Sequence, residues 1–163
     1  MTTLLQPGSG DIDTLLALSN KHEKEIGVFT KEAFSELVAI SFRTRMTEQG
    51  DAFLLALSGR APADAPNYRW FATHFDRFVY IDRVVVAERA RKRGLGSLLY
   101  NDIMEAARRD GHTRICCEVN IEPPNPASDA FHARLGFREI GRAYLPRRGK
   151  TVRYLTRDLT SGP

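Results

Sequence analysis

The chain has 163 residues, of which 42% are hydrophobic and 27% charged, as is typical of one globular domain that buries its own core. No apolar run approaches the roughly 18 residues of a membrane span. The first residues also lack the basic and apolar segments of a signal peptide, so neither feature is expected. The net charge of +4 attracts polyanions, yet no nucleic-acid-binding signature is present.

The first forty residues predict a short strand and two helices. Residues 4–5 begin the strand, and Asp11 has the position of an N-cap for a helix that reaches about residue 21. We expect this region to end at Gly27. Thr30 has the position of a second N-cap, for a helix over residues 31–40.

The next segment predicts a hairpin followed by loops. Residues 42–46 and 52–57 flank the turn Gln49-Gly50-Asp51. Residues 61–65 contain two prolines and predict a loop. Residues 67–75 are dense in aromatic side chains and are also interpreted as a loop. This second loop either walls an acceptor pocket or anchors itself to the core through Trp70 and Phe71.

The remainder alternates strands and helices. A β-branched strand and a long helix ending at Gly111 come first, followed by a strand, a short helix and a closing hairpin. Their predicted ranges are 78–86, 96–111, 115–121, 125–135, 139–145 and 151–159. Either Asn125 or Ser128 begins the short helix that ends at Leu135. Together with the earlier elements, this order predicts an α+β fold, a mixed β-sheet with helices on both faces.

The segment Arg91-Lys92-Arg93-Gly94-Leu95-Gly96, followed by Ser97, joins a predicted strand to a predicted helix. The first amides of a helix lack intrahelical partners, and the helix dipole is positive at that end. Glycines let a ligand approach the backbone closely. With three cations beside them, these features predict a site for a pyrophosphate.

The same segment departs from two common nucleotide-binding patterns. The dinucleotide fingerprint requires glycine where Leu99 stands, and the nucleoside-triphosphate loop requires Gly-Lys-Ser/Thr at its end. The pattern Arg-x-x-Gly-x-Gly resembles instead the acyl-CoA pyrophosphate loop of the GNAT superfamily of N-acyltransferases. A plain basic loop with a glycine turn is the alternative when this motif is taken alone.

A second motif strengthens the resemblance. Residues 125–137 read Asn-Pro-Ala-Ser-Asp-Ala-Phe-His-Ala-Arg-Leu-Gly-Phe. Asn125, Ser128, Phe131 and the closing Gly-Phe are in register with the downstream signature of the superfamily. His132 stands where those proteins usually have a tyrosine. The motif-bearing core spans about residues 78–137 of a domain expected to cover residues 1–163.

The resemblance implies an N-acetyltransferase that transfers the acetyl group of acetyl-CoA directly to an amine within a ternary complex. It implies that the strand ending at Val86 and the strand through Val119 splay apart around the pantetheine arm. The backbone of Val84, Val85 and Val86 would hold that arm and the thioester. The further cofactor-binding residues would be those of the basic loop and of the second motif: Arg91, Lys92, Arg93, Gly94, Leu95, Gly96, Ser97, Asn125, Ser128, Phe131 and His132.

Two carboxylates are candidates for the base that deprotonates the amine. Strand alternation puts Asp82 on one face with Val84 and Val86, and we prefer Asp82 for that reason. Its alternative role is an ion pair with an arginine such as Arg83. Glu118 lies in the other splayed strand, and its alternative role is that of a solvated or paired carboxylate.

His132 is the candidate acid for the leaving thiolate, because histidine holds both protonation states near neutral pH. It would otherwise bind only the pantetheine or a phosphate of the cofactor, and Tyr100 and Tyr144 are then the remaining donors. Cys116 and Cys117 are adjacent, which precludes a disulfide framework and indicates a reducing, cytoplasmic setting. A covalent route through either cysteine is less favoured than burial in a strand.

The acceptor is expected to be an amine on a small molecule or a peptide, and a homodimer is compatible with the resemblance. No metal is expected, because His22, His74, His112 and His132 show no ligand spacing. An acyl-CoA-binding sensor without turnover is the alternative function, which the replacement of the usual tyrosine by His132 keeps open. A basic nucleic-acid binder is a third and weaker alternative.

Overall fold

The computed structural model describes residues 2–22 and 29–160. The predicted end of the first helical region at Gly27 lies outside these residues. The described part is built around one seven-stranded sheet in the order β1-β2-β3-β4-β5-β7-β6. Its strands are β1 (Leu4–Leu5), β2 (Arg43–Thr47), β3 (Ala52–Ser58), β4 (Phe78–Val86), β5 (Arg114–Glu122), β6 (Arg138–Leu145) and β7 (Lys150–Asp158).

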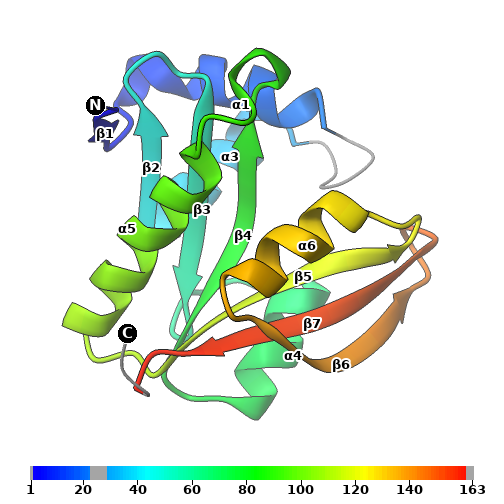
Figure 1. Ribbon diagram of the computed structural model, residues 1–163. Helices are drawn as coiled ribbons and strands as arrows, with labels where there is room; N and C mark the ends of the chain where they lie inside the picture. Colours follow the sequence, from blue (N-terminus) through cyan, green and yellow to red (C-terminus); the bar gives the residue numbers. More distant parts are fainter. Residues whose placement is uncertain (1, 23–28, 161–163) are drawn as a thin grey trace.

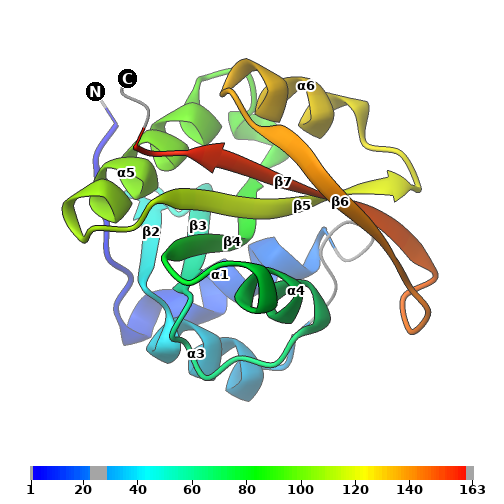
Figure 2. The same cartoon turned by 90° about the horizontal axis from the view of Figure 1, so that it is seen from below.

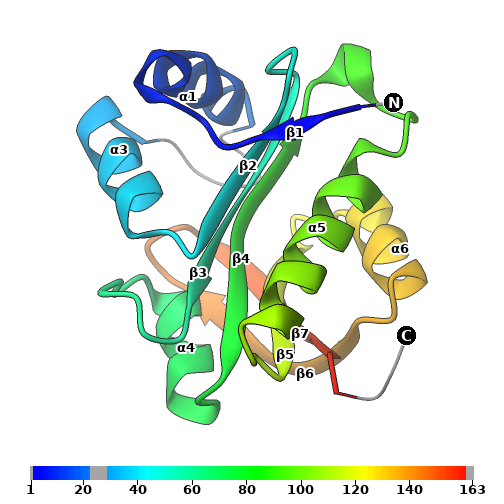
Figure 3. The same cartoon turned by 90° about the vertical axis from the view of Figure 1, so that its left-hand side faces the viewer.

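Helices cover both faces of the sheet, which confirms the predicted architecture (Figures 2 and 3). One face carries α1 (Ile12–Asn20), α3 (Lys31–Ile40) and α4 (Pro66–His74), and the other carries α5 (Leu95–Arg109) and α6 (Pro126–Arg134). We call these the α4 face and the α5 face. Among the described residues, no helix has both the length and the apolar character needed to cross a bilayer.

Local capping explains where several helices begin and end. The Thr30 side chain accepts a hydrogen bond from the Ala33 amide at 3.2 Å, as an N-cap should. Asp11 stands at the N-cap of α1, but its carboxylate accepts from the Gly8 amide and so closes the preceding 3-10 turn, η1 (Ser9–Asp11). Gly111 follows α5 with a φ of +80°, a backbone conformation that favours glycine.

The prediction of a loop over residues 67–75 is wrong, because α4 occupies that segment. Pro66 takes the first helical position, where its fixed φ suits the helix and its missing N–H is not needed. Tyr68 and Phe71 are three residues apart and both are buried. Trp70 stacks on Tyr154 of β7 with ring centroids 4.3 Å apart. Tertiary burial of this aromatic side therefore stabilises a helix whose sequence has little helical propensity of its own.

The two central strands, β4 and β5, are the parallel pair of the sheet, and they separate as predicted. Their register includes only Phe78–Arg114, Val79–Ile115 and Tyr80–Cys116, although each strand has nine residues. Beyond Tyr80 and Cys116 the strands run in different directions (Figure 1). The edge of β4 from Asp82 to Val86 therefore lies outside the β4–β5 ladder.

Candidate active site

The loop predicted to bind an anion lies at the end of β4. After the 3-10 turn η2 (Glu88–Ala90), exposed residues 91–94 lead into α5. Gly94 is the N-cap of α5 with a φ of +74°, and a Cβ added there would meet nothing within 4 Å. Leu95 is buried beneath the first turn, while Gly96 and Ser97 are partly exposed. The amides of this first turn and the open space above Gly94 are features that suit an anion.

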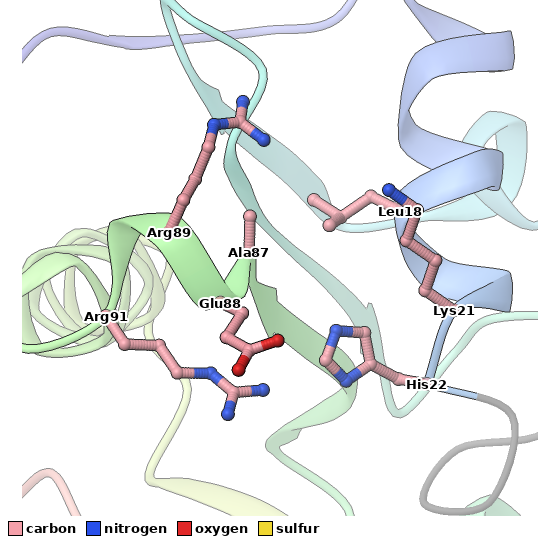
Figure 4. A pocket seen from close by; sticks show the side chains of 7 residues that line it. All are labelled: Leu18, Lys21, His22, Ala87, Glu88, Arg89 and Arg91. Carbon is pink, nitrogen blue, oxygen red and sulfur yellow. The ribbon is translucent and has the colours of Figure 1, made fainter.

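The cations of the loop are not equivalent. Arg93 lies 3.6 Å from the buried carboxylate of Asp51, so this residue also ties the loop to the end of the β2–β3 hairpin. Arg91 faces a cavity of about 530 Å³ between the end of α1 and the turn after β4 (Figure 4). The cavity combines cationic side chains with one carboxylate, and it is lined by Leu18, Lys21, His22, Ala87, Glu88, Arg89 and Arg91.

Helix α6 packs against the start of α5. Asn125 is its N-cap, and the Asn125 side chain accepts from the Ser128 amide at 3.3 Å. A Cβ at Gly96 would lie 3.2 Å from the ring of Phe131, so the absence of a side chain at Gly96 lets this ring approach. Asn125 and Phe131 therefore have structural roles in this protein, which hold whether or not they also contact a cofactor.

His132 is buried and both of its ring nitrogens are occupied. Its Nδ1 lies 2.8 Å from the carbonyl oxygen of Ser128, which can only accept, so Nδ1 carries the proton. Its Nε2 lies 2.7 Å from the Tyr100 hydroxyl and accepts from it when the ring is neutral. Burial lowers the pKa of His132 and raises the pKa of Tyr100 well above its ordinary value. The hydrogen shared by this pair therefore belongs to Tyr100.

A β-bulge at Asp82 corrects the predicted facing of this residue. In the β3–β4 ladder Ala56 pairs with Ile81 and Leu55 with Arg83, which leaves Asp82 as the extra residue. Asp82 shares the α4 face with Arg83, whose Nε donates to its carboxylate at 2.9 Å and whose Nη1 donates to Ser19 of α1. The prediction that Asp82 shares a face with Val84 and Val86 is therefore wrong.

The three valines that follow the bulge resume regular alternation. Val85 is buried and pairs with Phe53, which contacts Phe34 of α3. Val84 and Val86 are partly exposed and point toward the α5 face, as alternation from Val85 requires.

Glu118 lies at the centre of a hydrogen-bonded network on the α4 face. The Tyr80 hydroxyl donates to both of its carboxylate oxygens, at 2.9 and 2.7 Å, and the Asn67 amide donates to Oε1 at 2.9 Å. Burial, with a contribution from the negative charge of Asp82, raises the pKa of Glu118 to about 7 despite these donors. A carboxyl group that titrates near neutral pH is suited to accept a proton from an amine.

The cysteines of β5 do not resemble activated nucleophiles. Cys116 and Cys117 are buried, and burial raises the pKa of Cys116 to about 12 and that of Cys117 well above its ordinary value. Thiolates do not form readily in such surroundings. Both residues act as small apolar side chains of the core.

Where β4 and β5 separate, the β4–β5 ladder no longer divides the two faces of the sheet. The anion site at α5 and the Tyr100–His132 pair lie on the α5 face, and Glu118 lies on the α4 face, two residues beyond the last β4–β5 pair.

Three members of the Glu118 network were not predicted as site residues: Asn67, Tyr80 and Tyr154. Tyr80 could have been found, because it lies two residues before Asp82 in a strand that was recognised. Asn67 could not, because its segment was interpreted as a loop and its partner is 51 residues away.

Comparisons with known proteins agree with this arrangement. Residues 62–137 match the model of the acetyltransferase (GNAT) family. A phosphinothricin N-acetyltransferase of Streptomyces coelicolor is 42% identical over 72 residues. The matched segment covers 44% of this chain and 37% of that relative, well under its full length.

Solved structures share the fold over nearly the whole chain. Arabidopsis thaliana NAA60, solved with a bisubstrate analogue, superposes with a TM-score of 0.75 at 13% identity, covering 97% of this chain and 98% of its own. The yncA protein of Salmonella typhimurium, solved with its cofactor acetyl-CoA, superposes with a TM-score of 0.70 at 14% identity, covering 100% and 96%. These likenesses establish the fold, and residues 62–137 match the acetyltransferase (GNAT) family.

Proposed function

We propose that this protein is an N-acetyltransferase that transfers the acetyl group of acetyl-CoA directly to an amine. The observation that carries the proposal is the separation of β4 from β5, which joins an anion site on one face to a near-neutral carboxyl group on the other. The family match and the S. coelicolor relative support the reaction class.

The residues at the start of α5 fit the pyrophosphate of acetyl-CoA. The amides of the first turn, the open space at Gly94 and the cations Arg91 and Lys92 form a donor set suited to phosphate oxygens. Bound acetyl-CoA would supply the thioester. The exposed edge of β4 at Val84–Val86 would offer backbone groups to its pantetheine arm.

Glu118 is the proposed base. It would take the proton of the acceptor ammonium, so that the free amine can attack the thioester carbon as the bond to sulfur breaks. The hydroxyl of Tyr100 would turn from His132 Nε2 toward the sulfur and provide the proton for the leaving thiolate. Asp82 is less suited to accept a proton, because its carboxylate neutralises the buried guanidinium of Arg83.

Release of free thiol from acetyl-CoA tests the proposal, with a panel of amines that includes amino acids, polyamines and peptides. We expect acceptor-dependent thiol release, initial-velocity patterns that intersect, and a loss of about 10²–10⁴ in kcat for Glu118→Gln. Glu105→Gln, on the exposed face of α5, is the matched control. Tight acetyl-CoA binding with no thiol release for any acceptor would favour the sensor alternative.

A further inference from the structure

Asn67 is a buried polar residue that connects three elements of the fold. It lies in the first turn of α4 and is 7% exposed. Its Nδ2 donates to Glu118 Oε1 of β5 at 2.9 Å, and its Oδ1 accepts from the Tyr154 hydroxyl of β7 at 2.8 Å. Both ends of the amide are therefore used.

The orientation of this amide follows from the chemistry of its two partners. An ionised carboxylate can only accept, so the NH₂ group of Asn67 must face Glu118. The Asn67 carbonyl then faces Tyr154, whose hydroxyl can donate to it. Trp70, one helical turn along α4, stacks on the Tyr154 ring and so helps to hold that hydroxyl in place. Replacing the Tyr154 hydroxyl would remove the contact that keeps the amide from flipping.

We propose that Asn67 is a positioning residue for Glu118, and that α4 and β7 hold the carboxylate through it at the point where β4 and β5 separate. The effect of Asn67 on turnover rests on the proposed function. Its effect on the ionisation and placement of the Glu118 carboxyl group does not. Asn67 would act through Glu118 and need not touch either substrate.

Several groups face Glu118 from the surrounding elements, and their effects on its pKa have different signs. Burial and the charge of Asp82 favour the protonated form, whereas donors and nearby positive charge favour the ionised form. The donors are Tyr80 and Asn67, and the positive charge is that of Arg148 in the β6–β7 hairpin. Cys117 and Tyr100 on the opposite face, and Tyr154 on the neighbouring strand, are neutral at physiological pH, and burial raises the pKa of each further.

Loss of Asn67 removes one donor and leaves the opposing effects in place. The protonated form of Glu118 should then persist to higher pH, and less of the base should be ionised at neutral pH. A charge-assisted hydrogen bond is strong enough to move the titration by about one pH unit or more.

The direct test is a ¹³C NMR titration of the Glu118 carboxyl carbon in the protein without ligands. The Glu118→Gln variant assigns the signal. We expect a midpoint near 7 in the unmodified protein and a higher midpoint in Asn67→Leu, whose side chain has the same number and branching of heavy atoms. Asn101→Leu, on the exposed face of α5, is the matched control and should leave the midpoint unchanged. An unchanged midpoint in folded Asn67→Leu overturns the proposal.

Tyr154→Phe is the second variant and keeps the proposal testable should Asn67→Leu fail to fold. It removes one hydroxyl and should raise the same midpoint by a smaller amount, because the amide is then free to rotate. Thermal denaturation checks that each variant is folded. If folded Tyr154→Phe keeps the original midpoint, the chain of contacts from β7 through Asn67 has no role in setting the ionisation of Glu118.

The pH dependence of thiol release then connects the carboxyl group to turnover. In Asn67→Leu the acidic limb of kcat/KM should move to higher pH, with activity recovered at alkaline pH and an unchanged KM for acetyl-CoA. An equal loss at every pH would show a merely structural role. If the unmodified protein releases no thiol, the proposed function fails, while the NMR titration still decides the role of Asn67.

Discussion

Asp82 and Arg83 are consecutive residues of one strand, yet their side chains form an ion pair, with Arg83 Nε 2.9 Å from Asp82 Oδ2. Consecutive side chains of a regular strand point to opposite faces. The bulge opposite Leu55 removes that restriction and turns both side chains toward α1 and α3, where the guanidinium also lies over the ring of Phe29. Asp82, which the sequence favours as the base, is therefore the ion-pair partner of the buried guanidinium of Arg83.

Replacing Asp82 should therefore affect stability more than catalysis. Asp82→Asn removes a charged hydrogen-bond partner from the buried guanidinium of Arg83, at an expected cost of about 2 kcal/mol in the free energy of unfolding. Denaturant unfolding measures this cost, and Glu105→Gln, in an exposed pair with Arg109, should show almost none. The reverse result, unchanged stability with a kcat as low as in Glu118→Gln, would make Asp82 the base.

The raised pKa of Glu118 predicts how stability changes with pH. Between the ordinary glutamate pKa of 4.5 and about 7, the folded protein keeps a proton that the unfolded chain has released. The free energy of unfolding should therefore fall as the pH rises through this window, by on the order of 3 kcal/mol in total.

Glu118→Gln should lack this contribution, whatever its stability at low pH. Denaturant unfolding at several pH values between 4 and 8 measures the free energy of unfolding of both proteins. Relative to the unmodified protein, Glu118→Gln should become more stable as the pH rises. A difference that is constant with pH would contradict the raised pKa.

The Tyr100–His132 pair should act as one unit. If it supplies the proton to the leaving thiolate, Tyr100→Phe and His132→Phe should each lower kcat by about 10²–10⁴. The double variant should be little worse than either one, because residues that act together are non-additive. Steady-state kinetics at saturating acetyl-CoA measure these losses, and Tyr144→Phe, at a side chain 63% exposed, is the control. Should affinity collapse while kcat survives, His132 is a binding residue.

The two glycines of the anion loop should respond differently to substitution. Gly94→Val should abolish the rise in melting temperature that acetyl-CoA produces, a stabilisation of about 2.7 kcal/mol at 100 times Kd. Gly149→Val, at another exposed glycine with positive φ, should retain that rise despite a similar backbone strain. Gly96→Val should lower the melting temperature of the unliganded protein as well, because its side chain would collide with Phe131. A full rise in Gly94→Val would refute the pyrophosphate site.

Patterns along the sequence predict most of the architecture and the position of the basic loop before α5. Strands and helices with a clear period of 2 or 3.6 were recognised, as were the Thr30 cap and the turn at Gly111, because these signals depend only on near neighbours in the chain. The basic loop before α5 was found for the same reason: all its parts lie within seven consecutive residues. The divergence of β4 and β5 was also predicted, from the resemblance to a known family.

The arrangement of side chains on the α4 face follows instead from tertiary contacts. The helix over residues 66–74 forms because its aromatic side chains are buried against other elements, and the bulge at Asp82 exists only in register with β3. The pKa of Glu118 depends on burial and on partners 38 and 51 residues away in sequence. Register, burial and charge are set by neighbours in space, and a pattern read along one strand contains no information about which neighbours those are.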